Sequence, residues 1–222
     1  MLQALGHILP IAVAVAISSV PITATILILL SPKRNQAAVP FLIGWILGIV
    51  IVVSLFTIFA SVLPSPKFRE PDIFAAVGEI LVGAAMLVFA FITWRRSRNK
   101  PPSTTEPAYL RAIATFGALP AFGIALALNF RPKGLLLAIA AGLALHTANL
   151  DATSDIILIA IYTIIGASTV AVPIIVTLAS PVKMQPRLLS ARTWISKNNK
   201  IVTVLIMMMI GVVIIGTGLS TL

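Results

Sequence analysis

Long apolar stretches separated by short polar segments make up most of this chain of 222 residues. A helix that crosses a bilayer needs about 20 consecutive apolar residues, and the pattern supplies six such stretches. Five of them are single runs, at Leu5–Leu30, Val39–Leu63, Ile73–Trp94, Ile156–Leu178 and Ile201–Leu219. The remaining stretch is fourth in chain order and lies between Arg111 and Leu150. The pattern therefore predicts an all-α integral membrane protein with six transmembrane helices.

The fourth stretch is interrupted by the polar run Asn129–Lys133. As one straight helix, residues 111–150 would be about 60 Å long. That is twice the thickness of the hydrocarbon core of a bilayer, which is about 30 Å. We therefore expect a discontinuous or sharply kinked helix with its break near this run.

The first stretch contains a related pattern. Ser18 and Pro21 stand in the same polar-x-x-Pro order as Asn129 and Pro132, 111 residues further along. Transporters built from inverted repeats place paired broken helices at a site near the middle of the bilayer. We therefore expect two three-helix inverted repeats, with helices one and four kinked or broken. An ordinary proline kink is the alternative for helix one. The first repeat then occupies residues 1–94 and the second residues 112–222, and a basic cytoplasmic loop at residues 95–111 joins them.

The composition excludes soluble classes of protein. Hydrophobic residues make up 59% of the chain and charged residues 10%, and the mean hydropathy is +1.09. A soluble domain carries about 25% charged residues. The chain has no cysteine, so disulfides and thiolate chemistry are absent. Because no metal-ligand spacing, phosphate-binding loop or catalytic triad is present, we expect no enzymatic activity, no cofactor, no metal and no nucleic-acid partner.

The net charge of +10 mostly reports orientation. Twelve of the 16 basic residues fall in the three loops that six helices place on one side. They are Lys33, Arg34, Arg95, Arg96, Arg98, Lys100, Arg111, Lys183, Arg187, Arg192, Lys197 and Lys200. The positive-inside rule assigns these loops to the cytoplasm. We therefore expect a multi-pass membrane protein, with both termini outside the cytoplasm and anionic inner-leaflet lipids beside the loops.

The segment 186–200 carries a further pattern. Leu188, Ala191 and Ile195 recur at helical spacing, with Arg187 and other bases elsewhere around the turn. This arrangement predicts a basic amphipathic helix on the inner leaflet. A docking surface for a cytoplasmic protein is the alternative.

Two basic residues, Arg131 and Lys133, are best suited to binding a ligand. A charge at the centre of a bilayer costs about 2.5–3.5 kcal/mol on insertion scales, and such residues usually face a cavity or a partner. The N-termini of broken helices attract anions. If residues 131–133 instead lie at the inner interface, the two bases only anchor the helix. The predicted substrate-binding residues are Ser18, Ser19, Pro21, Asn129, Arg131, Pro132 and Lys133.

Glu79 is the one carboxylate well inside a predicted span. Paired with Arg131 or Lys133 it would be a counter-ion, and with a pKa raised by burial it would be a proton carrier. A shallow position near the outer interface is the other interpretation. No catalytic residue is assigned.

Several segments resemble the peptidoglycolipid-addressing (GAP) family, also called sulfolipid-addressing, of the LysE exporter superfamily. The matching segments are Ser18–Ile22, Leu29–Arg34, Phe41–Gly48, Leu128–Leu137 and Ala138–Gly142. In this chain Phe130 and Arg131 separate the Asn from the Pro-Lys pair, which adds a positive charge. The resemblance implies a three-plus-three repeat that helps to move envelope glycolipids or sulfolipids across the inner membrane of bacteria.

The leading hypothesis is thus a transporter or translocation factor for an anionic or glycosylated envelope lipid, with a membrane lipid or glycolipid as its substrate. One alternative is an assembly factor that docks a lipid-synthesis enzyme or a larger exporter through its basic loops. Another is an exporter of a small amino acid or cation, as the superfamily implies. A homodimer is compatible with each hypothesis.

Overall fold

The computed structural model describes residues 2–62, 80, 83–84, 87–88, 90–92, 94–95, 116–148 and 150–220. Every regular element with described bounds is a helix, so the all-α class is confirmed for this part of the chain. The helices are α1 (Leu2–Ala16), α2 (Ser19–Leu30), α3 (Arg34–Val62), α6 (Ala118–Asn129), α7 (Pro132–Thr147), α8 (Ala152–Ala179) and α9 (Pro181–Ser220).

Two of the described helices are long and apolar enough to cross a membrane unbroken, α3 and α8. Two bent pairs each supply one more candidate span, with bends of 45° between α1 and α2 and 61° between α6 and α7. These four correspond to predicted spans one, two, four and five. The third predicted span lies largely outside the described residues, and the sixth coincides with the C-terminal part of α9. Six spans in two inverted repeats stay a prediction.

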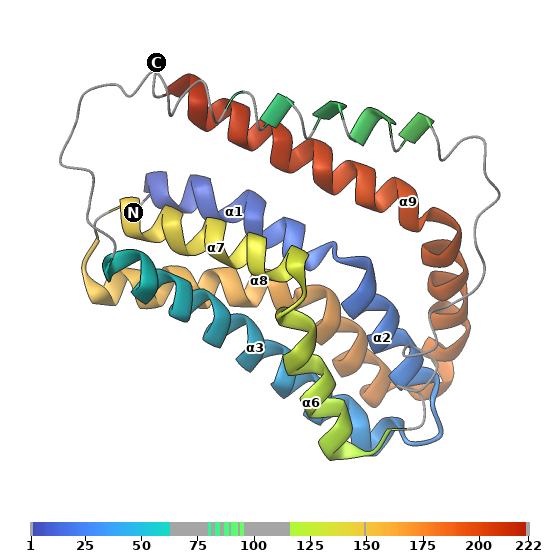
Figure 1. Ribbon diagram of the computed structural model, residues 1–222. Coiled ribbons are helices and arrows are strands. Elements are labelled where there is room, and N and C mark those ends of the chain that lie inside the picture. The colour runs from blue at the N-terminus through green and yellow to red at the C-terminus, as the bar shows by residue number, and fades with distance from the viewer. Residues whose placement is uncertain are drawn as a thin grey trace.

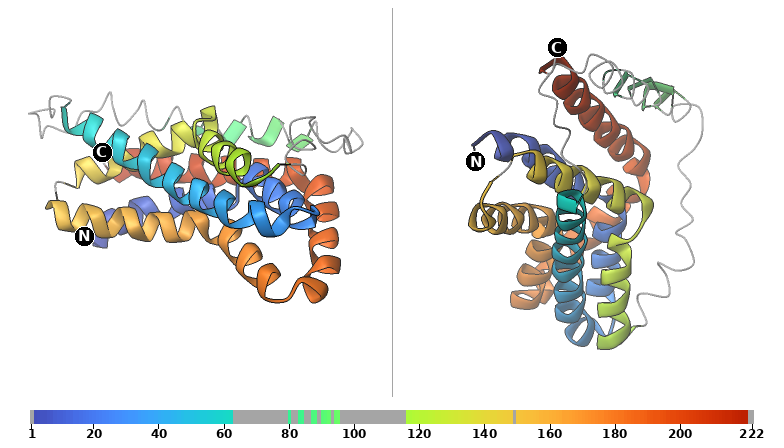
Figure 2. Two further views of the ribbon diagram at one scale, coloured as in Figure 1. Left: turned by 90° about the horizontal axis from the view of Figure 1, so that it is seen from below. Right: turned by 60° about the vertical axis from the view of Figure 1, so that its left-hand side comes forward.

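Helix α3 contacts four other helices of the bundle (Figure 1). It packs against α6 and α7 on one side and against α8 and α2 on the other, while α1 lies between α7 and α8. The two views in Figure 2 show the same helices side by side. Helix α9 starts beside α2, turns, and continues along the bundle with contacts to α1 and α8. The bent pair α1–α2 therefore meets α8 and α3, and the bent pair α6–α7 meets α3 and α1.

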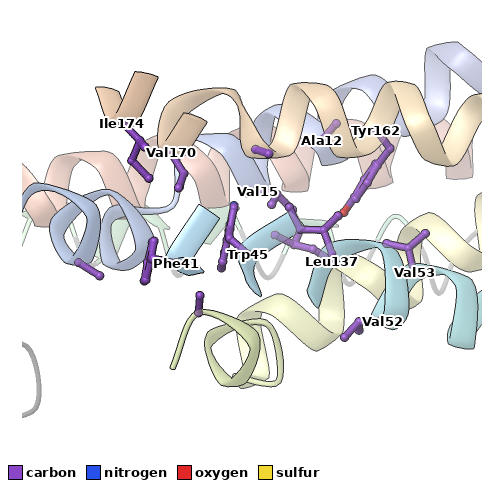
Figure 3. Packing of buried hydrophobic residues seen from close by; sticks show 14 of the residues in the cluster. Ala12, Val15, Phe41, Trp45, Val52, Val53, Leu137, Tyr162, Val170 and Ile174 are labelled. Atoms are coloured by element: carbon purple, nitrogen blue, oxygen red, sulfur yellow. The ribbon is translucent and has the colours of Figure 1, made fainter. Parts of the chain in front are cut away.

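The interior is apolar and contains a few large aromatic side chains. Phe41, Trp45 and Tyr162 are 0, 4 and 2% exposed, and they pack among small and aliphatic residues from α1, α3, α7 and α8 (Figure 3). The outer face of α3 is apolar as well, with exposed side chains four residues apart. They are Val39, Ile43, Leu47, Ile51 and Leu55. A helix that is apolar both on the face toward the protein core and on its outer face is typical of a transmembrane segment.

The first half of α9 corrects one prediction. Leu188, Ala191 and Ile195 do lie on one helical face, but this face packs against the protein core, with Leu188 only 4% exposed. The expectation that these three residues rest on the inner leaflet is therefore wrong, because the helix covers the bundle with them. Arg187 and Trp194 remain exposed on other sides of the same helix.

Candidate functional site

The break between α1 and α2 follows from Pro21. A proline removes the backbone donor that would bond the residue four positions earlier, and its ring clashes with that carbonyl. The residue at that position is Ile17, and α1 ends one residue before it. Ser18 has an extended backbone, with φ −69° and ψ 117°, and as the N-cap of α2 it makes no side-chain capping bond.

The carbonyl of Ala16, the last residue of α1, is bonded by another helix. The Thr169 hydroxyl of α8 donates to the Ala16 oxygen over 2.5 Å, across a separation of 153 residues in sequence. A backbone oxygen at membrane depth requires such a partner. The break is thus held in place by tertiary structure and leaves the Ser18 hydroxyl free of a capping role.

The break between α6 and α7 follows from Pro132 in the same way. The residue before a proline disfavours the helical region, and here Phe130 and Arg131 lie between the two helices. Proline is well suited to the first position of the helix that follows, which is where α7 begins. Both predicted breaks are therefore present at the expected sequence positions.

Asn129 ends α6 and is 6% exposed. Its Nδ2 donates to the Ala125 carbonyl over 3.1 Å. Across from it Gly48 on α3 leaves no room for a side chain, because a Cβ there would overlap Nδ2 and lie 2.9 Å from Cγ of Asn129. On the α7 side, a Cβ at Gly134 would lie 2.5 Å from the Asn129 oxygen. Gly48 thus clears the space that the Asn129 amide fills, and Gly134 makes room for the Asn129 backbone carbonyl.

A cavity of about 290 Å³ lies where the two breaks meet α3 and α8. The first turns of α2 and α7 both border it. Its lining residues are Val15, Ser18, Ser19, Val20, Pro21, Trp45, Ile49, Val52, Val53, Leu128, Asn129, Arg131, Gly134, Leu137, Ala138 and Tyr162. Five of the seven predicted binding residues therefore share one cavity.

The polar groups of this lining can donate hydrogen bonds, and one of them is cationic. Arg131 brings the positive charge, Ser18 and Ser19 bring hydroxyls, and none of the described residues that line the cavity is a carboxylate. The first-turn amides of α2 and α7 add partial positive charge. Arg131 is exposed, and the two serines are half-buried. Such a lining favours a ligand with negative or acceptor oxygens. No cluster of three metal-ligating side chains occurs among the described residues.

The other predicted site residues are placed only in part. Pro132 and Lys133 form the start of α7, so their backbone adjoins the cavity-lining Arg131, but their side chains are outside the description. Glu79 lies outside the described residues, and its pairing with a base stays a prediction.

A family comparison accounts for almost the whole chain. The family model described as "Sap, sulfolipid-1-addressing protein" matches residues 8–220. The chain belongs to this family. The sulfolipid-addressing resemblance expected from the sequence is thereby confirmed, and the wider LysE superfamily stays a prediction. Comparisons with curated proteins and with solved structures find no match.

Among the cavity-lining residues that were not predicted from the sequence, two are polar aromatic residues, Trp45 and Tyr162. Both line the cavity and are almost fully buried. One signal was available: each places a polar aromatic group six residues inside a predicted span, whereas Trp and Tyr usually collect at the membrane interface. Their position in the interior follows from the packing of α3 and α8 against α1 and α7.

Proposed function

We propose that this protein helps to export an anionic or glycosylated envelope lipid by holding the lipid head group in the cavity between its two broken helices. The observation that carries the proposal is the meeting of two helix breaks, two serines and Arg131 around one cavity. The family description, which names sulfolipid addressing, supports a lipid-related role in the membrane.

The cavity volume limits what can enter. Liquid water occupies about 30 Å³ per molecule, so 290 Å³ corresponds to roughly ten waters. Ligand pockets usually hold about 300–1,000 Å³. The cavity therefore suits a head group or a part of one, and the acyl chains of the lipid stay among the apolar outer faces of the helices.

Charge sets the preferred head group. The exposed Arg131 guanidinium meets an anion with charge-assisted, bidentate hydrogen bonds, and the N-termini of α2 and α7 favour negative charge at the same place. Lys133 follows Arg131 after one residue and adds a second charge near the break. A small cation would find no acidic partner among the described residues of this lining, so an anionic ligand is favoured.

Proteoliposomes that contain this protein alone test the proposal. The probe is a sulfated glycolipid with a fluorescent tag that a membrane-impermeant reductant quenches in the outer leaflet. We expect the protein to accelerate its crossing between leaflets. Replacing Arg131 by Gln removes charged hydrogen bonds worth about 1.5–3 kcal/mol, which slows the crossing about tenfold to a hundredfold.

Matched variants give the contrast. Lys133→Ala should also abolish crossing at normal abundance, while Lys133→Arg should retain part of it because the charge is kept but the geometry changes. Lys183→Ala removes an exposed base on α9, away from the cavity, and should leave the rate unchanged. If the vesicles show no protein-dependent crossing, an assembly role that docks other proteins replaces the transporter.

The proposed orientation places the protein in the bacterial inner membrane with both termini outside. It follows from the basic loops and the positive-inside rule. A reporter fused after Leu222 should then be periplasmic, and one inserted near Ser103 cytoplasmic. Finding both reporters on the same side would overturn the six-helix topology.

A further inference from the structure

Trp45 presents an unusual buried donor. It lies on α3, lines the cavity and is 4% exposed. Its indole Nε1 is buried, and no described residue accepts a hydrogen bond from it. An indole N–H can only donate, and a buried donor without an acceptor destabilises the folded state. Native proteins rarely keep such a group without a reason.

Tyr162 faces the same cavity from α8. Its side chain is 2% exposed and lines the cavity beside Val15 and Leu137. Figure 3 shows the ring reaching down from α8, with the hydroxyl oxygen turned toward these two aliphatic side chains. Val15 and Leu137 are aliphatic, so neither can accept or donate a hydrogen bond to the Tyr162 hydroxyl.

Two polar aromatic groups from different helices therefore flank one cavity whose charged residue, Arg131, lies at a helix break. Neither group carries charge, and one of them is restricted to donating. A neutral donor recognises an acceptor oxygen and rejects an ammonium group, which has only donors. Buried donors that are left unpaired by the wrong ligand make such a site selective.

We infer that Trp45 and Tyr162 form a neutral hydrogen-bonding pair that binds an oxygen atom of the head group next to the part held by Arg131. The inference rests on the proposed function and names the residues that select its ligand. The oxygen is either an anionic oxygen of a sulfate or phosphate group or a neutral oxygen of a sugar. The test separates these two sources.

The first test compares stability with transport. Tyr162→Phe removes only the hydroxyl, so the melting temperature should stay unchanged while crossing of the tagged sulfated glycolipid slows roughly threefold to tenfold, as for a neutral hydrogen bond. Trp45 is replaced by its benzothienyl isostere, in which sulfur takes the place of N–H. This variant should melt at the same or a higher temperature and should also transport more slowly. Trp194→Phe, at a 59% exposed position, is the matched control and should change neither quantity.

A structural role would give the opposite pattern. If the two residues only fill the core, both variants lower the melting temperature or leave transport at the wild-type rate, and either result overturns the inference. Loss of transport in Arg131→Gln, with normal transport in both aromatic variants, would leave the proposed function intact and remove only this pair.

The second test uses Trp45 as its own reporter. The chain has three tryptophans, so Trp94→Phe combined with Trp194→Phe leaves Trp45 as the only one. This protein is titrated in lipid nanodiscs with octyl sulfate, octyl glucoside and octylammonium. An acceptor at the indole N–H should move the emission to longer wavelength, and the ammonium probe should not.

The probes identify the oxygen. A shift with octyl sulfate that Arg131→Gln abolishes assigns an anionic oxygen, and a shift with octyl glucoside that survives Arg131→Gln assigns a sugar oxygen. An equal shift with the ammonium probe would overturn the inference, as would no shift with either oxygen-bearing probe. Binding of labelled octyl sulfate, measured separately, shows whether the Arg131 site itself is present.

Discussion

Gly48 is the position where a single methyl group should do the most damage to the site. It lies on α3 opposite Asn129, and Gly44 lies one turn before it, opposite the Phe122 carbonyl of α6. These glycines allow α3 and α6 to approach closely, as small residues do in membrane helix pairs. In Gly48→Ala the new Cβ would overlap the Asn129 Nδ2 and stand 2.9 Å from its Cγ.

The expected cost follows from two opposing effects. Overpacking an interior contact costs about 1–3 kcal/mol, and alanine gains about 0.5–1 kcal/mol over glycine within a helix. The net destabilisation is therefore roughly 0–2.5 kcal/mol. Asn129 cannot move away freely, because it is 6% exposed and bonded to the Ala125 carbonyl. We expect the upper end of this range and a loss of transport, since Asn129 lines the cavity.

A double-mutant cycle in reversible detergent unfolding measures the effect. Asn129→Ala removes the atoms that clash with the new Cβ. The double variant should therefore lose less unfolding free energy than the sum of the two single variants, because the effects of residues in contact are not additive. Gly123→Ala on α6 is the matched control, because a Cβ there meets nothing within 4 Å. It should be neutral or slightly stabilising. Strict additivity in the cycle, or equal effects of the two glycine changes, would refute the reasoning.

Two further predictions concern the ends of the helices. Thr169→Val keeps the side-chain shape but removes the hydrogen bond to the Ala16 carbonyl. The free energy of unfolding should fall by about 0.6 kcal/mol, the mean for hydrogen bonds between membrane helices. An unchanged free energy of unfolding would mean that this carbonyl has another partner. Hydrogen bonds from the Ser154 hydroxyl and amide and from the Thr153 amide hold the pKa of Asp151 below the ordinary value of an aspartate. The Asp151 cap therefore stabilises α8 above about pH 4 and loses this effect as the pH falls through the lowered pKa. Asp151→Asn keeps a capping side chain and should flatten this part of the melting-temperature profile, whereas a profile identical to the wild type would contradict the assignment.

The sequence was sufficient to locate the breaks because their cause is local. A proline in an apolar stretch, preceded by polar residues, disrupts the bonds of its own helix. The structure has breaks beside Pro21 and Pro132 and at no interior position of α3 or α8, although these helices contain Pro40 and Pro173. The polar residues upstream of Pro21 and Pro132 were therefore informative, and proline alone was not.

The partners that surround the breaks were not predictable, because they come from distant parts of the chain. Thr169 supports the first break across 153 residues, and Gly48 makes space for Asn129 from another helix. Hydrophobic periodicity identifies which face of a helix is apolar, but it does not say which helix covers that face. For the same reason the apolar face at Leu188 was assigned to the membrane surface, whereas the protein core covers it.

The unpredicted partners of the breaks and the wrong assignment of the face at Leu188 have one physical origin. In a bilayer the outside of the protein is as apolar as its core, so an apolar pattern cannot distinguish lipid from protein neighbours. Polar groups do make this distinction, because lipid cannot satisfy them. Ser18, Asn129 and Arg131 line one cavity, and their role in binding stays a prediction. Trp45 and Tyr162 would have been found by the same criterion. In this chain, polar atoms within apolar spans predict which helices meet, and the cavity lies where those atoms converge.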